Sequence, residues 1–220
     1  GGYDKALSTL NGLKPIKGFI WKEYSPATAK RLGFERRYFS ESNAGRIDAI
    51  RARIRAWNEA GMLTTEEERL LIADLLSAVN RVANIAGTYG CFLSTWQQQA
   101  NERIQLRPRV LRREPCDVTT SVMDARDVQV KPNDLVYLDP PYTKRQYAAY
   151  YHLPETISLG DTPVVEGVSG LRPWKSKASE YCYKGRALPA LLSVISGLDA
   201  SRVLLSYSED GHIPIDALTK

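Results

Sequence analysis

Apolar side chains recur at helical spacing in the first half of the chain. Between residues 43 and 61 they stand at steps of three and four residues: Ile47, Ile50, Ile54 and Trp57. This spacing puts them on one face of a predicted helix, with Asn43 as its N-cap and Gly61 at its end. Four arginines fall outside that face, toward solvent or a ligand: Arg46, Arg51, Arg53 and Arg55.

A second helix is predicted from residue 64 onward. Thr64 and Glu67 have the spacing of a capping box, and the buried face of the helix would consist of Leu71, Leu75, Val79 and Val82. The stretch 91–101, CFLSTWQQQAN, predicts a third helix. The basic stretch 103–113, RIQLRPRVLRR, predicts a linker or a phosphate-contacting loop rather than a core element.

The second half of the chain changes to short apolar runs that are typical of buried strands. The runs at 117–124, 133–139 and 202–208 predict three strands, and residues 185–198 predict a helix between the last two. This order favours an α/β fold, part of a doubly wound, Rossmann-like parallel sheet with a mainly helical segment before it.

The change in pattern predicts two regions, 1–115 and 116–220. Functional residues of a doubly wound sheet lie at the carboxyl ends of its strands, and Asp124, Asp139 and the pair Ser206–Tyr207 stand at such ends.

Charge separates the same two regions. Residues 1–115 carry 19 Lys and Arg against 12 Asp and Glu, a balance of +7, whereas residues 116–220 carry 11 against 13, a balance of −2. A basic first half suits a polyanion such as nucleic acid, although arginine-rich helices can also simply be solvated.

Composition narrows the class of protein further. Hydrophobic residues make up 43% of the 220 and charged residues 25%, which is typical of a globular protein. Neither a membrane-length apolar run nor a signal-peptide pattern is present, so we expect a cytoplasmic protein that does not contact a membrane. Three distant cysteines and two histidines offer no spacing for a metal site, so no metal is expected.

The strand predicted at 133–139 ends in a distinctive segment, Asp139-Pro140-Pro141-Tyr142, called here the DPPY segment. Two prolines fix two φ angles and offer no N–H, so the chain must leave the sheet there. The result is a rigid ledge that carries a carboxylate, an outward backbone carbonyl and an aromatic ring.

Two acceptors beside a stacking surface suit an amino group on a flat ring. Hydrogen bonds from both amino hydrogens free the nitrogen lone pair for attack on a methyl sulfonium, and the carboxylate stabilises the developing positive charge. The alternative is a strand-terminating turn with an incidental Asp and Tyr. Such a tetrad should arise by chance in only about one chain in a hundred of this size.

At this point the sequence resembles a known family, the adenine-specific DNA methyltransferases of the DNA adenine methylase class, especially its restriction-modification members. The resemblance rests on LVYLDPPY and on further segments in the same order: RRYFSESNAGRIDAIRARIRAW, VANIAGTYGCFLSTW, DLVYLDPPYTKRQYAAYYHLPETI, GVSGLRPW and VLLSYSEDG. It implies methyl transfer from S-adenosyl-L-methionine to the adenine amino group of a base flipped out of double-stranded DNA, by a Rossmann-like methyltransferase fold.

The resemblance also implies roles for single residues. The catalytic group would be Asp139, Pro140, Pro141 and Tyr142, with the amino group held by Asp139 and the Pro140 carbonyl and the base stacked on Tyr142. The cofactor would be contacted by Asp124, Ala125 and Asp139. Arg145, Gln146 and Tyr147 would line the pocket of the target base or of the cofactor. Ser206 and Tyr207 would lie beside the target base, although these two also fit an ordinary strand terminus. Tyr150 and Tyr151 fit helix packing better.

In the family's order of motifs, the region before the catalytic strand recognises DNA. The candidate contacts are Arg36, Arg37, Arg46, Arg107, Arg109, Arg112 and Arg113. A cognate restriction endonuclease is the further partner that the resemblance implies.

One departure from the family keeps other functions open. The family's glycine-rich cofactor loop is missing before residue 18, and the chain stops soon after LLSYSEDG, so we expect a chain truncated at both ends. The alternatives are an RNA adenine methyltransferase and a DNA-binding module with an incomplete catalytic half.

Overall fold

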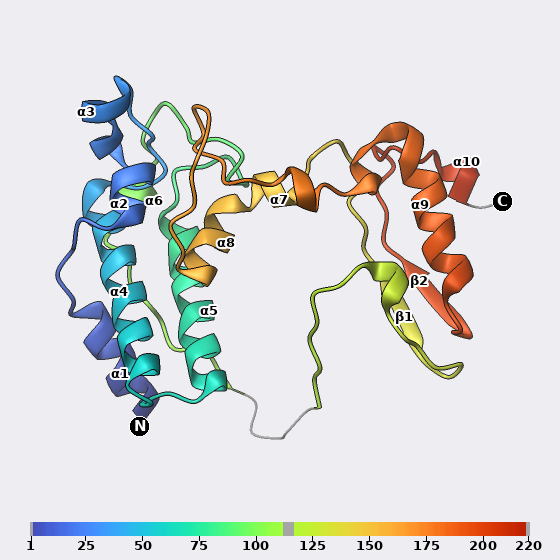
Figure 1. Cartoon of the computed structure of the whole chain (residues 1–220), viewed down its shortest axis with the longest axis horizontal. Coiled ribbons are helices and arrows are strands. Elements are labelled where there is room, and N and C mark those ends of the chain that lie inside the picture. The colour runs from blue at the N-terminus through green and yellow to red at the C-terminus, as the bar shows by residue number, and fades with distance from the viewer. Residues whose placement is uncertain (1, 112–116, 219–220) are drawn as a thin grey trace. The chain divides into compact units, whose positions relative to one another are not determined.

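The computed structural model of the chain describes residues 2–111 and 117–218 (Figure 1). Its α-helices and strands, in chain order, are α1 (Gly2–Asn11), α2 (Phe19–Tyr24), α3 (Ala29–Leu32), α4 (Glu41–Glu59), α5 (Thr65–Val82), α6 (Gln98–Asn101), β1 (Leu135–Leu138), α7 (Tyr147–Tyr150), α8 (His152–Leu159), α9 (Lys184–Gly197), β2 (Arg202–Leu205) and α10 (Ile215–Leu218). Short 3-10 helices are η1 (Pro26–Thr28), η2 (Ala125–Asp127), η3 (Lys175–Lys177) and η4 (Glu180–Cys182). None of the described helices is both long and apolar enough to cross a bilayer.

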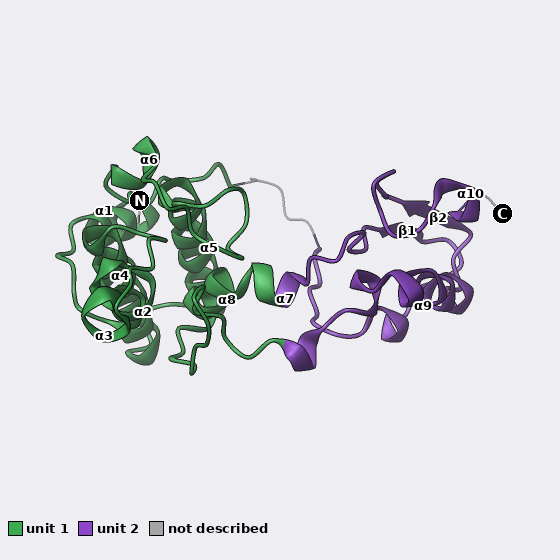
Figure 2. Cartoon of the chain, turned by 90° about the horizontal axis from the view of Figure 1, so that it is seen from above, with its two compact units in different colours: residues 1–111, 149–174 green, residues 112–148, 175–220 purple. Residues whose placement is uncertain are grey.

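The chain divides into two compact units, coloured separately in Figure 2. The helical unit consists of residues 1–111 and 149–174, and the sheet unit of residues 112–148 and 175–220. The sequence predicts one boundary near residue 115, which would place α8 in the second unit. In the structure, α8 belongs to the helical unit. The reason is burial, because Leu153 and Ile157 of α8 belong to the helical core.

The core of the helical unit forms between the two long helices, α4 and α5, which pack side by side (Figure 1). The predicted stripe of α4 is confirmed, since Ile47, Ile50 and Ile54 are buried and Trp57 is half-buried against the same cluster. The predicted face of α5 is also confirmed, because all four of its members are buried: Leu71, Leu75, Val79 and Val82. Burial of these two apolar faces stabilises this unit.

Local capping sets the start of each long helix. Thr64 and Glu67 form both hydrogen bonds of the predicted capping box. The N-cap of α4 is Ser40, whose Oγ accepts from the Asn43 N–H at 3.3 Å, so the prediction of Asn43 as N-cap is wrong. Gly61 follows the helix end with a φ of +66°, as predicted.

The helix predicted over 91–101 is wrong except for α6, its last four residues. The preceding residues follow an irregular path organised by Asn84, whose carbonyl accepts from the Leu93 N–H at 2.9 Å. The Asn84 side chain also accepts from the Gln97 N–H at 3.0 Å. Because these backbone amides bond to Asn84, they do not form helical hydrogen bonds.

The sheet unit contains the predicted strand, helix and strand. β1 and β2 pair in parallel, with Leu135 opposite Arg202 and Leu138 opposite Leu205, and α9 is the crossover between them (Figure 1). The core of this unit consists of Ala187 and Leu191 of α9 together with Ile213, and side chains of both strands pack against it. The described residues form only these two strands, and the wider doubly wound sheet remains a prediction.

The strand predicted over 117–124 is absent from the described residues. Val118, Val122 and Met123 are exposed there, and the backbone forms no ladder. An apolar segment forms a strand only when its backbone pairs with a neighbouring strand. Among the described residues, no strand pairs with residues 117–124. Asp124 instead opens η2 as its N-cap.

Candidate active site

The ends of the two strands lie side by side at the start of the DPPY segment. The Ser206 N–H donates to the Leu138 carbonyl at 2.8 Å, directly before Asp139. This bond continues the parallel ladder by one residue beyond β2, so residues 206–207 begin next to the DPPY segment. The predicted positions of Asp139 and Ser206–Tyr207 directly after strands are therefore confirmed, whereas Asp124 follows no described strand.

The DPPY segment forms an anchored ledge. Asp139 is exposed, Pro140 and Pro141 are half-buried, and Tyr142 keeps 36% of its surface exposed. The Tyr142 carbonyl accepts from the His212 N–H at 2.8 Å. Two prolines at one end and this bond at the other limit how far the ledge can move, while the Asp139 carboxylate stays open to solvent.

A second tyrosine stands beside the ledge. The rings of Tyr142 and Tyr207 lie 6.1 Å apart at 67°, an edge-to-face arrangement. The Tyr207 hydroxyl accepts from the Ile213 N–H at 3.2 Å, and the ring packs on the small core of the sheet unit. The ledge therefore presents a carboxylate next to a pair of ordered aromatic rings.

The residues after the ledge take different roles. Gln146 is only 7% exposed, and its amide bonds the Ser179 backbone twice, at 3.1 and 2.8 Å. Both the amide nitrogen and the amide oxygen of Gln146 are hydrogen-bonded to the protein itself. The prediction of Gln146 as a base contact is therefore corrected: the side chain has a structural role within the sheet unit. The side chains of Arg145 and Tyr147 are exposed and remain predicted contacts.

A pocket of about 700 Å³ opens beside the predicted cofactor residues. Asp124 and Ala125 line it together with Ser179, Tyr181 and Ala190. Arg126 holds the Asp124 carboxylate with two hydrogen bonds, at 2.9 and 2.7 Å, and these bonds lower the pKa of that carboxyl below its usual range. Asp124 is thus an ionised acceptor at the pocket wall.

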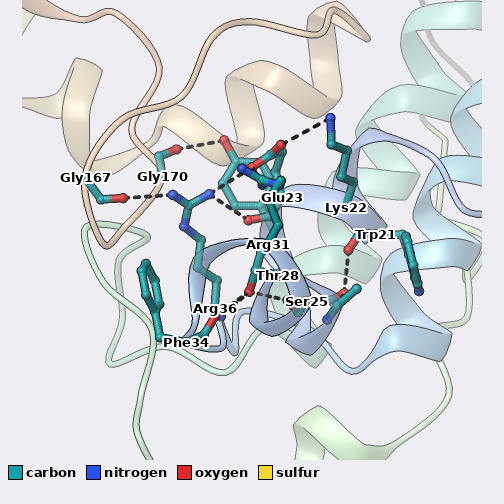
Figure 3. A network of polar contacts seen from close by, with 12 residues as sticks. Trp21, Lys22, Glu23, Ser25, Thr28, Arg31, Phe34, Arg36, Gly167 and Gly170 are labelled. Carbon is teal, nitrogen blue, oxygen red and sulfur yellow. Dashed lines mark hydrogen bonds and ion pairs between the residues drawn. The ribbon is translucent and has the colours of Figure 1, made fainter.

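The prediction that Arg36 contacts DNA is wrong, because the side chain is buried and its guanidinium bonds groups of the protein itself (Figure 3). It is 3% exposed, and its guanidinium pairs with the Glu23 carboxylate at 3.0 Å. It also donates to the carbonyls of Val168 at 2.9 Å and Gly167 at 2.8 Å. These acceptors satisfy the guanidinium inside the helical unit, which leaves no path to a phosphate.

Other predicted DNA contacts are partly engaged in the structure. Arg37 pairs with Glu35 at 2.6 Å, and Arg109 pairs with the buried Asp74 at 2.6 Å, yet both stay accessible at the surface. Arg46 is half-buried and donates to the Leu13 carbonyl at 2.8 Å. Arg112 and Arg113 lie outside the described residues.

Residues 103–109, called here the basic segment, run extended along the helical unit. Ile104 and Leu106 are buried, whereas Arg103, Gln105 and Arg107 are exposed. The alternation follows from the period of two in an extended chain. The expectation that this segment lies outside the core is therefore wrong for Ile104 and Leu106. The alternation of apolar and polar residues over 103–107 is the sequence signal for their burial.

Two asparagines fix the basic segment on the helices. Asn11 bonds the Leu106 backbone twice, at 2.9 and 2.8 Å, and Asn43 accepts from the Ile104 N–H at 3.0 Å. Arg107 lies near Arg81 of α5, and burial followed by this positive charge lowers the pKa of Arg81. Among the described residues, no carboxylate pairs with Arg107.

The sequence does not predict the residues that hold the ledge and the segment after it: the His212 N–H bonds the ledge at Tyr142, Gly211 lies beside His212 in the same turn, and Ser179 bonds Gln146. Gly211 and His212 belong to the turn after β2, and His212 also places its ring nitrogen Nε2 3.2 Å from the Cys182 carbonyl. The glycine after two acidic residues predicts a turn but not what the turn contacts.

Comparison with known sequences identifies the class of protein to which this chain belongs. The chain belongs to the D12 class N6 adenine-specific DNA methyltransferase family, which it matches over residues 11–219.

Individual relatives are named as modification enzymes. The chain is 37% identical over 194 residues to the type II methyltransferase M.FokI of Planomicrobium okeanokoites, covering 88% of this chain and 29% of the relative. It is 32% identical over 203 residues to the modification methylase StsI of Streptococcus sanguinis, covering 92% and 30%. It is 34% identical over 210 residues to the type II methyltransferase M.NlaIII of Neisseria lactamica, covering 95% and 61%.

The chain therefore spans about 30% of the length of the first two relatives and 61% of the third. No solved structure matched the chain.

Proposed function

We propose that the protein transfers a methyl group from S-adenosyl-L-methionine to the exocyclic amino group of adenine in a specific DNA sequence. The observation that carries this proposal is the DPPY ledge, which presents an exposed carboxylate and a tyrosine at the carboxyl end of β1. Membership of the D12 class and the names of the relatives support adenine in DNA as the substrate.

The residues of the ledge suit this reaction. The Asp139 carboxylate and the Pro140 carbonyl would accept hydrogen bonds from the two amino hydrogens, which leaves the nitrogen lone pair free to attack. Because positive charge develops on that nitrogen, the nearby carboxylate stabilises the transition state more than the ground state. Tyr142 would stack on the adenine after it leaves the duplex.

The pocket beside Asp124 is the proposed binding site of the methyl donor. S-adenosyl-L-methionine would supply the methyl group. The pocket offers an ionised acceptor for the hydroxyl or amino groups of an adenosine, and Tyr181 offers an aromatic surface. We propose that Asp124, Ala125 and Tyr181 hold the adenosine part of the cofactor. The two described strands would then be part of a wider, doubly wound sheet.

DNA would be bound through the helical unit. Arg107 has an exposed guanidinium on a fixed backbone, and Arg103 stands four residues before it on the same exposed side of the segment. Arg37, Arg46 and Arg109 remain candidates with fewer free donors. Such contacts to phosphates would give affinity that depends on salt, while recognition of sequence needs contacts to base edges.

Transfer of labelled methyl groups by the full-length protein tests the proposal. Asp139→Asn should lower the rate of transfer to duplex DNA by about 100-fold or more, because it removes the charge that faces the nitrogen. Asp134→Asn is the matched control, since Asp134 precedes β1 and its side chain accepts a local N–H, from Lys131 at 2.8 Å.

Each alternative function has its own outcome in this assay. Transfer to structured RNA in preference to duplex DNA would assign the chemistry to RNA. A full-length protein that binds DNA but transfers no methyl group to either would be a DNA-binding module with an inactive catalytic half. For a restriction-modification enzyme, the methylated DNA should resist cleavage by an endonuclease with the same recognition sequence.

A further inference from the structure

We propose that Gly211 is a positioning residue for the proposed methyl transfer, acting through Tyr207 and Tyr142. This inference rests on the proposed function, because it assigns those tyrosines to the surface that receives the adenine. Residues 208–213 are called here the clamp turn. The turn closes with the Gly211 N–H donating to the Ser208 carbonyl at 2.9 Å.

The clamp turn holds both tyrosines through consecutive amides. The His212 N–H donates to the Tyr142 carbonyl at 2.8 Å, and the Ile213 N–H donates to the Tyr207 hydroxyl at 3.2 Å. Ile213 is 2% exposed and packs with Leu191 of α9. The amides that hold the tyrosines are therefore fixed by the core of the sheet unit.

Gly211 is required for space and not for an unusual backbone angle. A Cβ atom at this position would overlap Cε1 of Tyr207, and would lie 2.9 Å from both Cζ of that ring and the Ser208 carbonyl oxygen. Protein interiors do not accommodate atoms at such separations without moving them. The Tyr207 ring cannot retreat without breaking its bond to Ile213 or changing its contact with Tyr142.

Tyr207 in turn limits where Tyr142 can lie, because their rings meet edge to face. A displaced Tyr142 would still offer an aromatic surface, but it would present the adenine at a changed angle to Asp139. Displacements of about 1 Å at a reacting centre can cost on the order of 100-fold in rate. We therefore expect Gly211 to govern turnover and not the binding of DNA or cofactor.

The test compares two glycine-to-alanine changes in the full-length protein. Gly211→Ala should lower kcat for DNA methylation by about 10- to 100-fold, with the KM values for S-adenosyl-L-methionine and DNA unchanged. Gly197→Ala is the control, because a Cβ at this α9 position meets no atom within 4 Å. Both variants should melt cooperatively, and wild-type kcat in Gly211→Ala would overturn the inference.

Tyr207→Ala provides the second arm. Once the ring is removed, adding Gly211→Ala should lower kcat less than twofold, because the two changes act through the same contact. This double variant also tests the inference if Gly211→Ala alone fails to fold, since removing the ring should restore cooperative melting. An equal loss of kcat with and without the ring would contradict a role through Tyr207.

A structural readout separates this inference from the proposed function. The ring-proton NMR signals of labelled Tyr142 and Tyr207 should shift in Gly211→Ala and not in Gly197→Ala, without any substrate. If the signals shift but the wild type transfers no methyl group, the proposed function is refuted, while the role of Gly211 in positioning the two tyrosine rings is supported. If the signals do not shift, the inference that Gly211 positions Tyr207 and Tyr142 is refuted.

Discussion

The Arg36 guanidinium donates a hydrogen bond to the Gly167 carbonyl at 2.8 Å, across 131 positions of sequence (Figure 3). The same side chain pairs with the Glu23 carboxylate, which also accepts from Arg31. One arginine thus ties the start of the helical unit to the loop that follows α8. Its charge serves the fold and not the DNA surface.

Replacing Arg36 should therefore destabilise the helical unit. Arg36→Met removes the guanidinium donors to three carbonyls, those of Glu23, Gly167 and Val168, and the ion pair with the Glu23 carboxylate. The free energy of unfolding should therefore fall by about 3–5 kcal/mol. Tryptophan fluorescence during chemical denaturation measures this, since all four tryptophans lie in the helical unit. Arg53→Met, at an exposed site on α4, should change it by less than about 0.5 kcal/mol.

The capping box of α5 gives a second, smaller prediction. Thr64→Ala removes the acceptor for the Glu67 N–H, so the free energy of unfolding should fall by about 1 kcal/mol. Thr65→Ala, one residue inside the helix, is the control and should leave stability within about 0.5 kcal/mol of wild type. Equal effects of the two changes would argue against the capping role.

His152 should make the stability of the helical unit depend on pH. Burial lowers the pKa of His152 to about 4 from an ordinary 6.5, and its Nε2 lies 3.0 Å from the Tyr89 carbonyl. The folded state takes up the proton less readily than the unfolded state. The stabilising contribution is thus complete above pH 6.5 and is lost as the pH falls from 6.5 toward 4.

Denaturation at pH 7 and pH 5 measures this loss. Between these values the wild type should lose about 2 kcal/mol more stability than His152→Phe does. Burial raises the pKa of Asp48 to about 6, which acts in the opposite direction but equally in both proteins. The same dependence on pH in both proteins would contradict the assignment to His152.

The basic segment predicts a change in the salt dependence of DNA binding. Arg107→Ala in the full-length protein should weaken binding to all sequences alike and lower the slope of log K against log salt by about 1. Gln105→Ala removes a neighbour on the same exposed side without removing charge, so its slope should stay at the wild-type value. Binding titrations at several salt concentrations give both slopes.

Local spacing was sufficient to predict much of the fold. The apolar stripes of α4 and α5, the capping box at Thr64 and the parallel pair of strands all follow from patterns within a few residues. The N-cap of α4 does not, because Ser40 and Asn43 are both good caps. The structure uses Asn43 elsewhere, where it accepts from the Ile104 N–H 61 positions away.

The candidate site divides in the same way. The DPPY segment could be placed at a strand end because prolines act on their own backbone. Arg36 and Arg37 look alike in the sequence, and what distinguishes the buried Arg36 is its contact with distant groups, the Glu23 carboxylate and the carbonyls at 167 and 168. The role of Gly211 depends on where the Tyr207 ring packs. The residues next to Gly211 in the sequence do not predict the position of that ring.

The asparagine bonds that fix the basic segment have a thermodynamic consequence. Since Asn11 and Asn43 hold its backbone before DNA arrives, association would order only the arginine side chains and not the chain itself. Binding through this segment should therefore add little to the heat-capacity change, in contrast to an arginine-rich tail that folds on its target.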